Sequence, residues 1–251
     1  MSGHWTIRPL CFGEFEALEK SKFTYDRNAG EKIVAPCFAW LLQSSAETVL
    51  VDTGPSAPEL ANRWHPGIRR TPAQNPAGAL RAAGVAREQI SRVILTHLHW
   101  DHCYNLELFP HARFLVQAEE LRAAVDPIPT QRPIYEVGMP GLQPPWLPFF
   151  GQLQLLRGDT EVAPGLSVVL LPGHTPGLQG VLVDTAEGNY LLASDAVPLY
   201  ENLPHGGIGP IPSGLHIDVA ACLQSMDRMA TLADRILPGH DVKILERPQY
   251  P

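Results

Sequence analysis

Seven residues of this 251-residue chain have the types and the spacing of metal ligands. Four of them lie in the segment THLHWDH, where His97, His99, Asp101 and His102 follow the apolar run Val93–Leu95. Side chains two residues apart in an extended backbone point the same way, so we expect His97 and His99 to bind one ion together. Asp101 and His102 then turn toward a neighbouring position. Imidazole and carboxylate donors of this kind are typical ligands of zinc and similar divalent ions.

The other three candidate ligands each follow an apolar run that ends in small residues. His174 and His240 follow Pro-Gly pairs, and Asp195 follows an Ala-Ser pair. Small residues let the backbone approach a crowded centre closely. Four ligands cannot fill two metal sites, and strands packed side by side bring their ends to one edge. We therefore expect these three donors to complete a two-ion centre.

The elements that must position these ligands are predicted from apolar, β-branched runs bounded by turn residues. The predicted strands are 33–42, 48–51, 92–95, 113–116, 166–171, 181–183, 190–192 and 235–237. Helical spacing predicts helices over 76–83, 118–125 and 216–233. Groups of strands with helices between them favour an α/β sandwich in which sheet packs on sheet and helices cover the outside.

Long Pro-rich segments separate some of these elements. Segments 55–76 and 126–150 are predicted to be neither strand nor helix, and with 196–215 they are expected to form lids or pocket walls. The chain shows no repeat and no Gly/Ser linker, so one domain over 1–251 is the simplest division.

Composition limits the classes of partner. The net charge is −7, and 45% of the residues are hydrophobic. An acidic surface disfavours nucleic acid and anionic membranes as partners. No signal peptide and no membrane-length apolar run is recognised, so a soluble, cytoplasmic monomer or homodimer is expected. The four cysteines lack any C-x-x-C pair and are interpreted as reduced thiols.

Several nearby residues are given structural roles. Asp52, in VDTG, is expected to orient a ligand or the turn, and Cys103 is expected to be a small buried thiol. The remaining histidines are interpreted as surface or packing residues, and only His205 is considered for a pocket contact: His4, His65, His111, His205 and His216.

Taken together, THLHWDH, PGHTPG, SDA and PGHD, with VDTG upstream, resemble the metallo-β-lactamase fold hydrolases over residues 33–245. The order of the elements and the segments LFPHARFLVQAEEL and SDAVPLYENL resemble the N-acyl homoserine lactonase branch. The resemblance implies an αββα sandwich. It also implies that one ion is held by His97, His99 and His174, the other by Asp101, His102 and His240, and that Asp195 bridges them.

The implied activity is hydrolysis of a lactone or related ester, as in quorum quenching. Two divalent ions are expected, with zinc (Zn²⁺) first and iron, cobalt or manganese as alternatives. A metal-bridging hydroxide would attack the lactone carbonyl, and Asp101 or the second ion would assist the leaving ring oxygen. The lactonases place an active-site tyrosine three residues after the bridging aspartate, where this chain has Pro198. Tyr200 is the candidate to replace that tyrosine and to donate to the oxyanion.

Two alternative functions remain open from the sequence. A thioesterase of the glyoxalase II type has a helical extension beyond its last ligand, whereas few residues follow His240 here. A non-catalytic metal-binding module is disfavoured because structural zinc sites normally close with four protein ligands.

Overall fold

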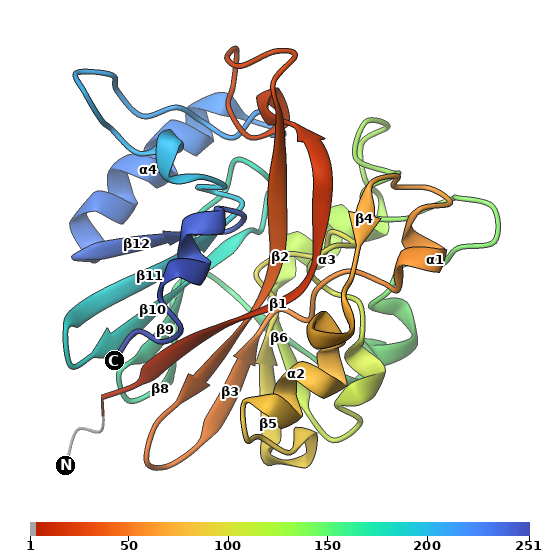
Figure 1. Cartoon of the computed structure of the whole chain (residues 1–251), viewed down its shortest axis with the longest axis vertical. Helices are drawn as coiled ribbons and strands as arrows, with labels where there is room; N and C mark the ends of the chain where they lie inside the picture. The colour runs from red at the N-terminus through yellow and green to blue at the C-terminus, as the bar shows by residue number, and fades with distance from the viewer. Residues whose placement is uncertain (1–3) are drawn as a thin grey trace.

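The computed structural model describes residues 4–251, which form two β-sheets packed face to face with helices on the outside (Figure 1). The first sheet has the order β4-β1-β2-β3-β5-β6-β7, and the second has the order β12-β11-β10-β9-β8. The strands of the first sheet are β1 (Thr6–Glu19), β2 (Lys32–Gln43), β3 (Thr48–Val51), β4 (Ile68–Arg69), β5 (Ile90–Ile94), β6 (Arg113–Gln117) and β7 (Leu153–Leu156). Those of the second are β8 (Thr160–Ala163), β9 (Leu166–Leu170), β10 (Gln179–Thr185), β11 (Gly188–Ser194) and β12 (Arg235–Pro238).

The core between the sheets follows from the two-residue period of the strands. In β2, Phe38, Trp40 and Leu42 point into the layer between the sheets, while Ala39 and Leu41 belong to the cluster on the outer face. The same alternation holds in β3, β5 and β11. Both faces of these strands are therefore apolar, as expected for strands covered on both sides.

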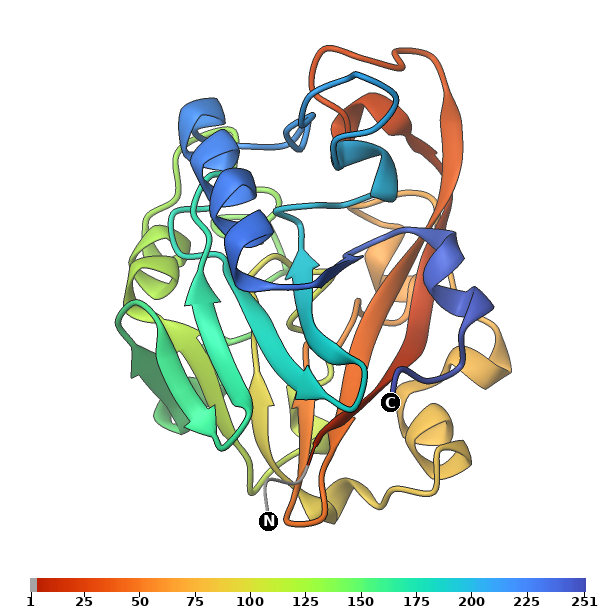
Figure 2. The same ribbon diagram turned by 90° about the vertical axis from the view of Figure 1, so that its left-hand side faces the viewer.

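Within residues 4–251, four α-helices accompany the sheets: α1 (Pro58–Ala61), α2 (Pro76–Ala82), α3 (Ala118–Val125) and α4 (Val219–Leu232). Helices α2 and α3 contribute Leu80 and Leu121 to the outer cluster of the first sheet. Helix α4 covers the outer face of the second sheet (Figure 2), against which it packs Met226 and Met229. The predicted αββα sandwich is confirmed.

Strand direction determines which loops meet. Strands β3, β5 and β6 are parallel to one another, and β11 is parallel to β12. Strand β9 is antiparallel to β10, which is antiparallel to β11, so β9 and β11 run the same way. The loops that follow β5, β9, β11 and β12 consequently lie at one edge of the sandwich.

Most predicted elements are present, with differences at their boundaries. Strands β1, β7 and β8 were missed, because β1 mixes Pro, Gly and charged residues and the other two are short. The segment 55–76, predicted to be irregular, holds α1 and β4. The helix predicted from 216 begins at Val219, because the Asp218 side chain accepts hydrogen bonds from the backbone N–H groups of Ala220 and Ala221.

The cysteines and the helix lengths bear on two of the expectations from composition. All four cysteines are unpaired. Among residues 4–251, no helix combines the length and the apolar character that a membrane crossing requires.

Candidate metal centre

The structure brings all seven predicted ligand side chains to the shared edge. His97, His99, Asp101 and His102 lie in the loop after β5, and the other three follow β9, β11 and β12. Their donor atoms form three groups of mutual neighbours within 4.8 Å: His97 with His99 and His174, His97 with His102 and Asp195, and Asp101 with His102 and His240. All except Asp101 are buried. The loops bring together donors that are up to about 140 positions apart, as strands of common direction predict.

The inner atoms of this cluster lie close together. His99 Nδ1 is 3.1 Å from His174 Nε2. Asp195 contacts both sides of the cluster, with Oδ1 at 3.0 Å from His240 Nε2 and Oδ2 at 3.3 Å from His174 Nε2. Its Oδ1 is also 3.2 Å from His102 Nε2. Asp195 thus lies between His174 on one side and His102 and His240 on the other.

The outer nitrogen of every imidazole in the cluster has a protein oxygen partner. These contacts are His97 Nδ1 with Thr96 Oγ1 at 3.1 Å, His99 Nε2 with Gln131 Oε1 at 3.0 Å, His102 Nδ1 with Asp52 Oδ2 at 2.9 Å, His174 Nδ1 with the Leu215 carbonyl at 2.6 Å and His240 Nδ1 with the Pro36 carbonyl at 2.8 Å. An outer N–H bound in this way leaves the lone pair of the inner nitrogen directed at the centre, as in metal-ligating histidines.

The inner nitrogens provide an independent test of whether a cation fits. Nε2 of His97 is fully buried and has no hydrogen-bond partner among the described residues. The close approach of His99 Nδ1 to His174 Nε2 joins two atoms that are both acceptors when their outer nitrogens donate. Buried acceptors without donors are costly in a protein interior, and a bound cation satisfies them. The residues present therefore fit divalent ions.

Burial and mutual charge shift the pKa values of the cluster. Burial lowers the pKa of His97 and His99 well below the usual imidazole range. Burial also opposes charge on His102, but Asp101 and Asp195 outweigh it and raise the pKa of His102 well above its usual range. Burial likewise opposes ionisation of Asp195, yet the neighbouring imidazoles, His240 foremost, hold its pKa well below the usual carboxyl range. Burial thus favours the neutral, metal-binding form of His97 and His99, and the imidazoles favour the ionised form of Asp195. The carboxylates favour a proton on His102, which a metal ion must displace when it binds.

Asp52 orients its surroundings, as the sequence predicted. Besides His102 it accepts hydrogen bonds from the Thr96 backbone N–H and hydroxyl, both at 2.8 Å. The Thr96 hydroxyl also lies 2.9 Å from Ser194 Oγ. Asp52 therefore connects the end of β3 to the loop after β5, and Thr96 connects that loop to the end of β11.

A cavity of about 250 Å³ lies over the cluster and is reached from the protein surface. Asp101, Asp195, His99 and His174 form part of its floor. Its walls come from residues 15–23, from segment 55–76, from the loop after β5 and from residues near 134 and 215. The residues are Phe15, Leu18, Lys22, Phe23, Trp64, His65, Pro66, Trp100, Ile134 and Leu215. Aromatic and apolar walls over a polar floor are typical of a small-molecule site.

The structure places Tyr200 outside this cavity. Its ring packs against the core cluster between the sheets, and it lines a different surface hollow, which it shares with His205 and Asp241. Burial, with Tyr250 and Asp241 nearby, raises the pKa of its phenol. The expected return of the phenol to the metal ligands is not observed, because the backbone N–H of Tyr200 is bound to Asp241 and directs the chain toward the C-terminal segment.

Other site residues were missed or misjudged from sequence. His65, interpreted as a loop residue, lines the cavity and stacks on Trp100 with ring centroids 4.1 Å apart. His205, for which a pocket contact is possible from sequence, lines the hollow beside Tyr200 and not the cavity over the cluster; it is exposed, and its Nδ1 bonds the Leu203 carbonyl. Nothing in the sequence indicates that Gln131 contacts His99, apart from its place in a long Pro-rich loop. Cys103 is a fully buried thiol, as expected.

With this geometry in place, comparison with known proteins identifies the family. The chain belongs to the metallo-beta-lactamase superfamily, whose sequence model matches residues 33–240. It is 27% identical over 244 residues to an N-acyl homoserine lactonase of a Bacillus species, covering 90% of this chain and 89% of the relative. It is 30% identical over 181 residues to the N-acyl homoserine lactonase AiiB of Agrobacterium fabrum, covering 64% of this chain and 63% of the relative.

Solved structures agree on the fold. An N-acyl homoserine lactone hydrolase, with the product N-hexanoyl-L-homoserine bound at its catalytic metal center, superimposes with a TM-score of 0.78. The match covers 98% of this chain and 96% of that chain, at 23% identity. The lactonase likeness is therefore seen in the sequence relatives, and the solved structure agrees with the sandwich fold.

Proposed function

We propose that this protein is a metal-dependent hydrolase that opens the ring of a lactone, with N-acyl homoserine lactones as the first substrate class to test. The observation that carries the proposal is the arrangement of five imidazoles whose outer nitrogens are bound to protein oxygens and whose inner nitrogens converge around Asp195. The lactonase relatives, which align over most of the chain, support the choice of substrate class.

The proposed ligand set divides into two groups. His97, His99 and His174 would hold one ion, Asp101, His102 and His240 the other, and Asp195 would contact both. Imidazole with carboxylate favours Zn²⁺, and the same donors accept iron, cobalt or manganese. Divalent ions held there supply a Lewis acid for the carbonyl oxygen and hydroxide at neutral pH.

The chain's own residues supply the rest of the chemistry. Asp101 is the ligand that is least buried, it lines the cavity, and its side chain is 13% exposed. A carboxyl group there can carry a proton to the ring oxygen as the ester bond breaks. The aromatic and aliphatic walls would hold an acyl chain and exclude water from the reacting ester.

Metal content is the first test. Elemental analysis of the purified protein should give close to two transition-metal ions per chain, and His97→Ala should lower that number. His111→Ala is a matched control, because His111 is exposed and precedes β6, which runs parallel to β5, at the end of these strands opposite the ligand loop. Full activity with a single ion would contradict the dinuclear proposal.

Substrate class is the second test. The metal-loaded protein should be compared on acyl homoserine lactones, an S-acyl glutathione, a phosphodiester and a cephalosporin by following acid release. A preference of tenfold or more in kcat/KM for the lactone is expected. The same preference for the thioester would replace the lactonase proposal with a thioesterase of the glyoxalase II type.

A further inference from the structure

One polar group in the wall of the cavity has no part in the proposed metal chemistry. His65 stacks almost parallel on Trp100, with an angle of 5° between the rings. Its Nε2 lies 3.1 Å from Oε1 of Glu136, whose side chain is only 2% exposed. The second carboxylate oxygen of Glu136 accepts a hydrogen bond from the Tyr104 hydroxyl. A buried carboxylate therefore holds a histidine at the substrate cavity.

The group joins two loops that are distant in sequence. His65 belongs to the segment after α1, and Glu136 belongs to the loop after α3, which runs beside α1 in Figure 1. Glu136 has a φ of 56°, in the left-handed region that non-glycine residues rarely adopt. Such backbone conformations persist only where the surrounding contacts require them, and they are concentrated at functional sites.

His65 lines the cavity, and its contacts determine which tautomer the neutral ring adopts. Glu136 accepts from Tyr104, and a carboxylate can only accept, so His65 donates its Nε2 hydrogen. In the neutral imidazole, Nδ1 is then a hydrogen-bond acceptor. No group within residues 4–251 donates to this atom. Stacking on Trp100, which lies between two of the proposed ligands in sequence, fixes the plane in which the acceptor lies.

We propose that His65 is a specificity-determining residue, whose Nδ1 accepts a hydrogen bond from the amide N–H of an N-acylated lactone bound over the metal centre. In such a substrate the N–H is attached to the ring carbon next to the scissile carbonyl, so it enters the cavity with the reacting ester. This inference rests on the proposed lactonase function and narrows its substrate class to lactones that carry a hydrogen-bond donor beside the ester.

The test compares two lactones at pH 8.5: N-hexanoyl homoserine lactone and its carba analogue, in which a methylene replaces the amide N–H. His65→Phe keeps an aromatic ring to stack on Trp100 and removes the acceptor. We expect it to lower kcat/KM for the amide by about five- to tenfold, the size of one lost neutral hydrogen bond, and for the carba analogue by less than twofold.

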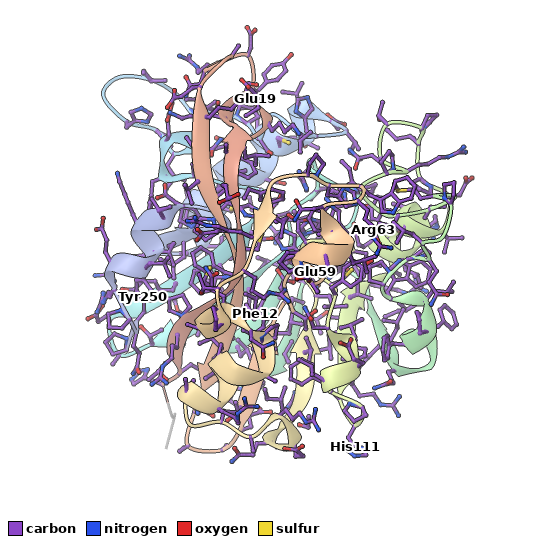
Figure 3. All side chains as sticks on the ribbon, turned by 45° about the vertical axis from the view of Figure 1, so that its right-hand side comes forward. Phe12, Glu19, Glu59, Arg63, His111 and Tyr250 are labelled. Carbon is purple, nitrogen blue, oxygen red and sulfur yellow. The ribbon has the colours of Figure 1, made fainter. Side chains whose placement is uncertain are left out.

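Two control variants separate this role from a structural one. Tyr104→Phe removes the other hydrogen bond to Glu136 and leaves Nδ1 of His65 in place, so its effect should be equal on the two lactones. His111→Phe removes an exposed histidine at the lower edge of the molecule, well below Arg63 in Figure 3, and should change neither. Metal content and thermal unfolding are measured for each variant.

The outcomes are distinct. An equal loss on both lactones, or none, with His65→Phe would overturn the inference, as would an amide-selective loss with Tyr104→Phe. If His65→Phe does not fold, His65→Asn replaces it. The asparagine oxygen can occupy the position of Nδ1, so at least half of the wild-type preference for the amide should remain, and a folded variant without preference overturns the inference. A wild-type protein that is active on thioesters but on neither lactone refutes the proposed function itself.

Discussion

Glu120 offers a test of how the ligand loops are held. Its side chain lies on α3, is completely buried and accepts four hydrogen bonds. Oε1 accepts from the Leu98 backbone N–H at 2.9 Å and the Tyr135 hydroxyl at 2.8 Å. Oε2 accepts from the Thr175 hydroxyl at 2.6 Å and the Gly177 backbone N–H at 3.2 Å. One carboxylate thus connects the loop after β5 to the loop after β9.

Glu120→Gln replaces one acceptor oxygen with an amide that donates. If the amide nitrogen lies at the Oε2 position, the Thr175 hydroxyl can turn and accept from it, but the Gly177 backbone N–H loses its acceptor. If the amide nitrogen lies at the Oε1 position, the Tyr135 hydroxyl can turn in the same way, but the Leu98 backbone N–H loses its acceptor. Either orientation leaves one buried backbone N–H without an acceptor, at a cost of about 1 to 3 kcal/mol. Burial raises the pKa of Glu120, because the charged carboxylate is unfavourable in the protein interior. Removing that charge offsets part of the cost, and we expect a net loss of about 1 to 2 kcal/mol in the free energy of unfolding.

The metal centre should also respond. Leu98 lies between His97 and His99, and Gly177 is so close to α3 that a Cβ atom there would lie 2.1 Å from the Glu120 backbone nitrogen. The loop that holds Gly177 therefore cannot move closer to α3 to compensate for the lost hydrogen bond. We expect weaker metal retention in Glu120→Gln, by about tenfold, because residues that orient ligands typically contribute this much to affinity.

The assay uses urea unfolding of the metal-free protein, so that bound ions do not contribute to stability, and competition with a chelator for metal affinity. Glu119→Gln is the matched control: its side chain is exposed and pairs with Arg122, so a change within about 0.5 kcal/mol is expected. If the two variants are indistinguishable in stability and in metal affinity, the reasoning about Glu120 is refuted.

Three other predictions concern the site. Asp52→Ala removes the acceptor for His102 Nδ1 and should weaken metal binding about 10- to 100-fold, measured by chelator competition; unchanged affinity would show that Asp52 does not orient the ligand. Burial opposes a charge on His240 and His102, but Asp195 outweighs it at His240, and Asp101 and Asp195 outweigh it at His102, so the pKa of both imidazoles is raised and both bind a proton more tightly in the metal-free protein. Metal uptake should then release protons and be tighter at pH 8 than at pH 6, and an indicator dye that detects no release would contradict this. Tyr200→Phe should leave kcat within threefold of wild type, since the ring packs away from the cavity; a hundredfold loss with intact metal content would restore its catalytic role.

The sequence predicted the sandwich and the clustered side chains for identifiable reasons. The continuous apolar runs of β2, β3 and β11 are buried only if both faces of these strands are covered. His174, Asp195 and His240 directly follow such strands, so their positions depend on strand direction and little else. At these positions the strand pattern and the residue types agree, so the sequence alone was sufficient to predict that these three side chains cluster.

Only the tertiary structure determines which groups hold the ligand side chains in their orientations. The acceptors for His174 and His240 are the backbone carbonyls of Leu215 and Pro36, and a carbonyl carries no signature of residue type. His65 and Glu136 meet because two irregular loops pack together, and the direction of Tyr200 follows from a hydrogen bond to Asp241. Residue type and spacing therefore determined which side chains can bind a metal ion, whereas contacts between loops far apart in sequence determined how those side chains are oriented and what lines the cavity above them.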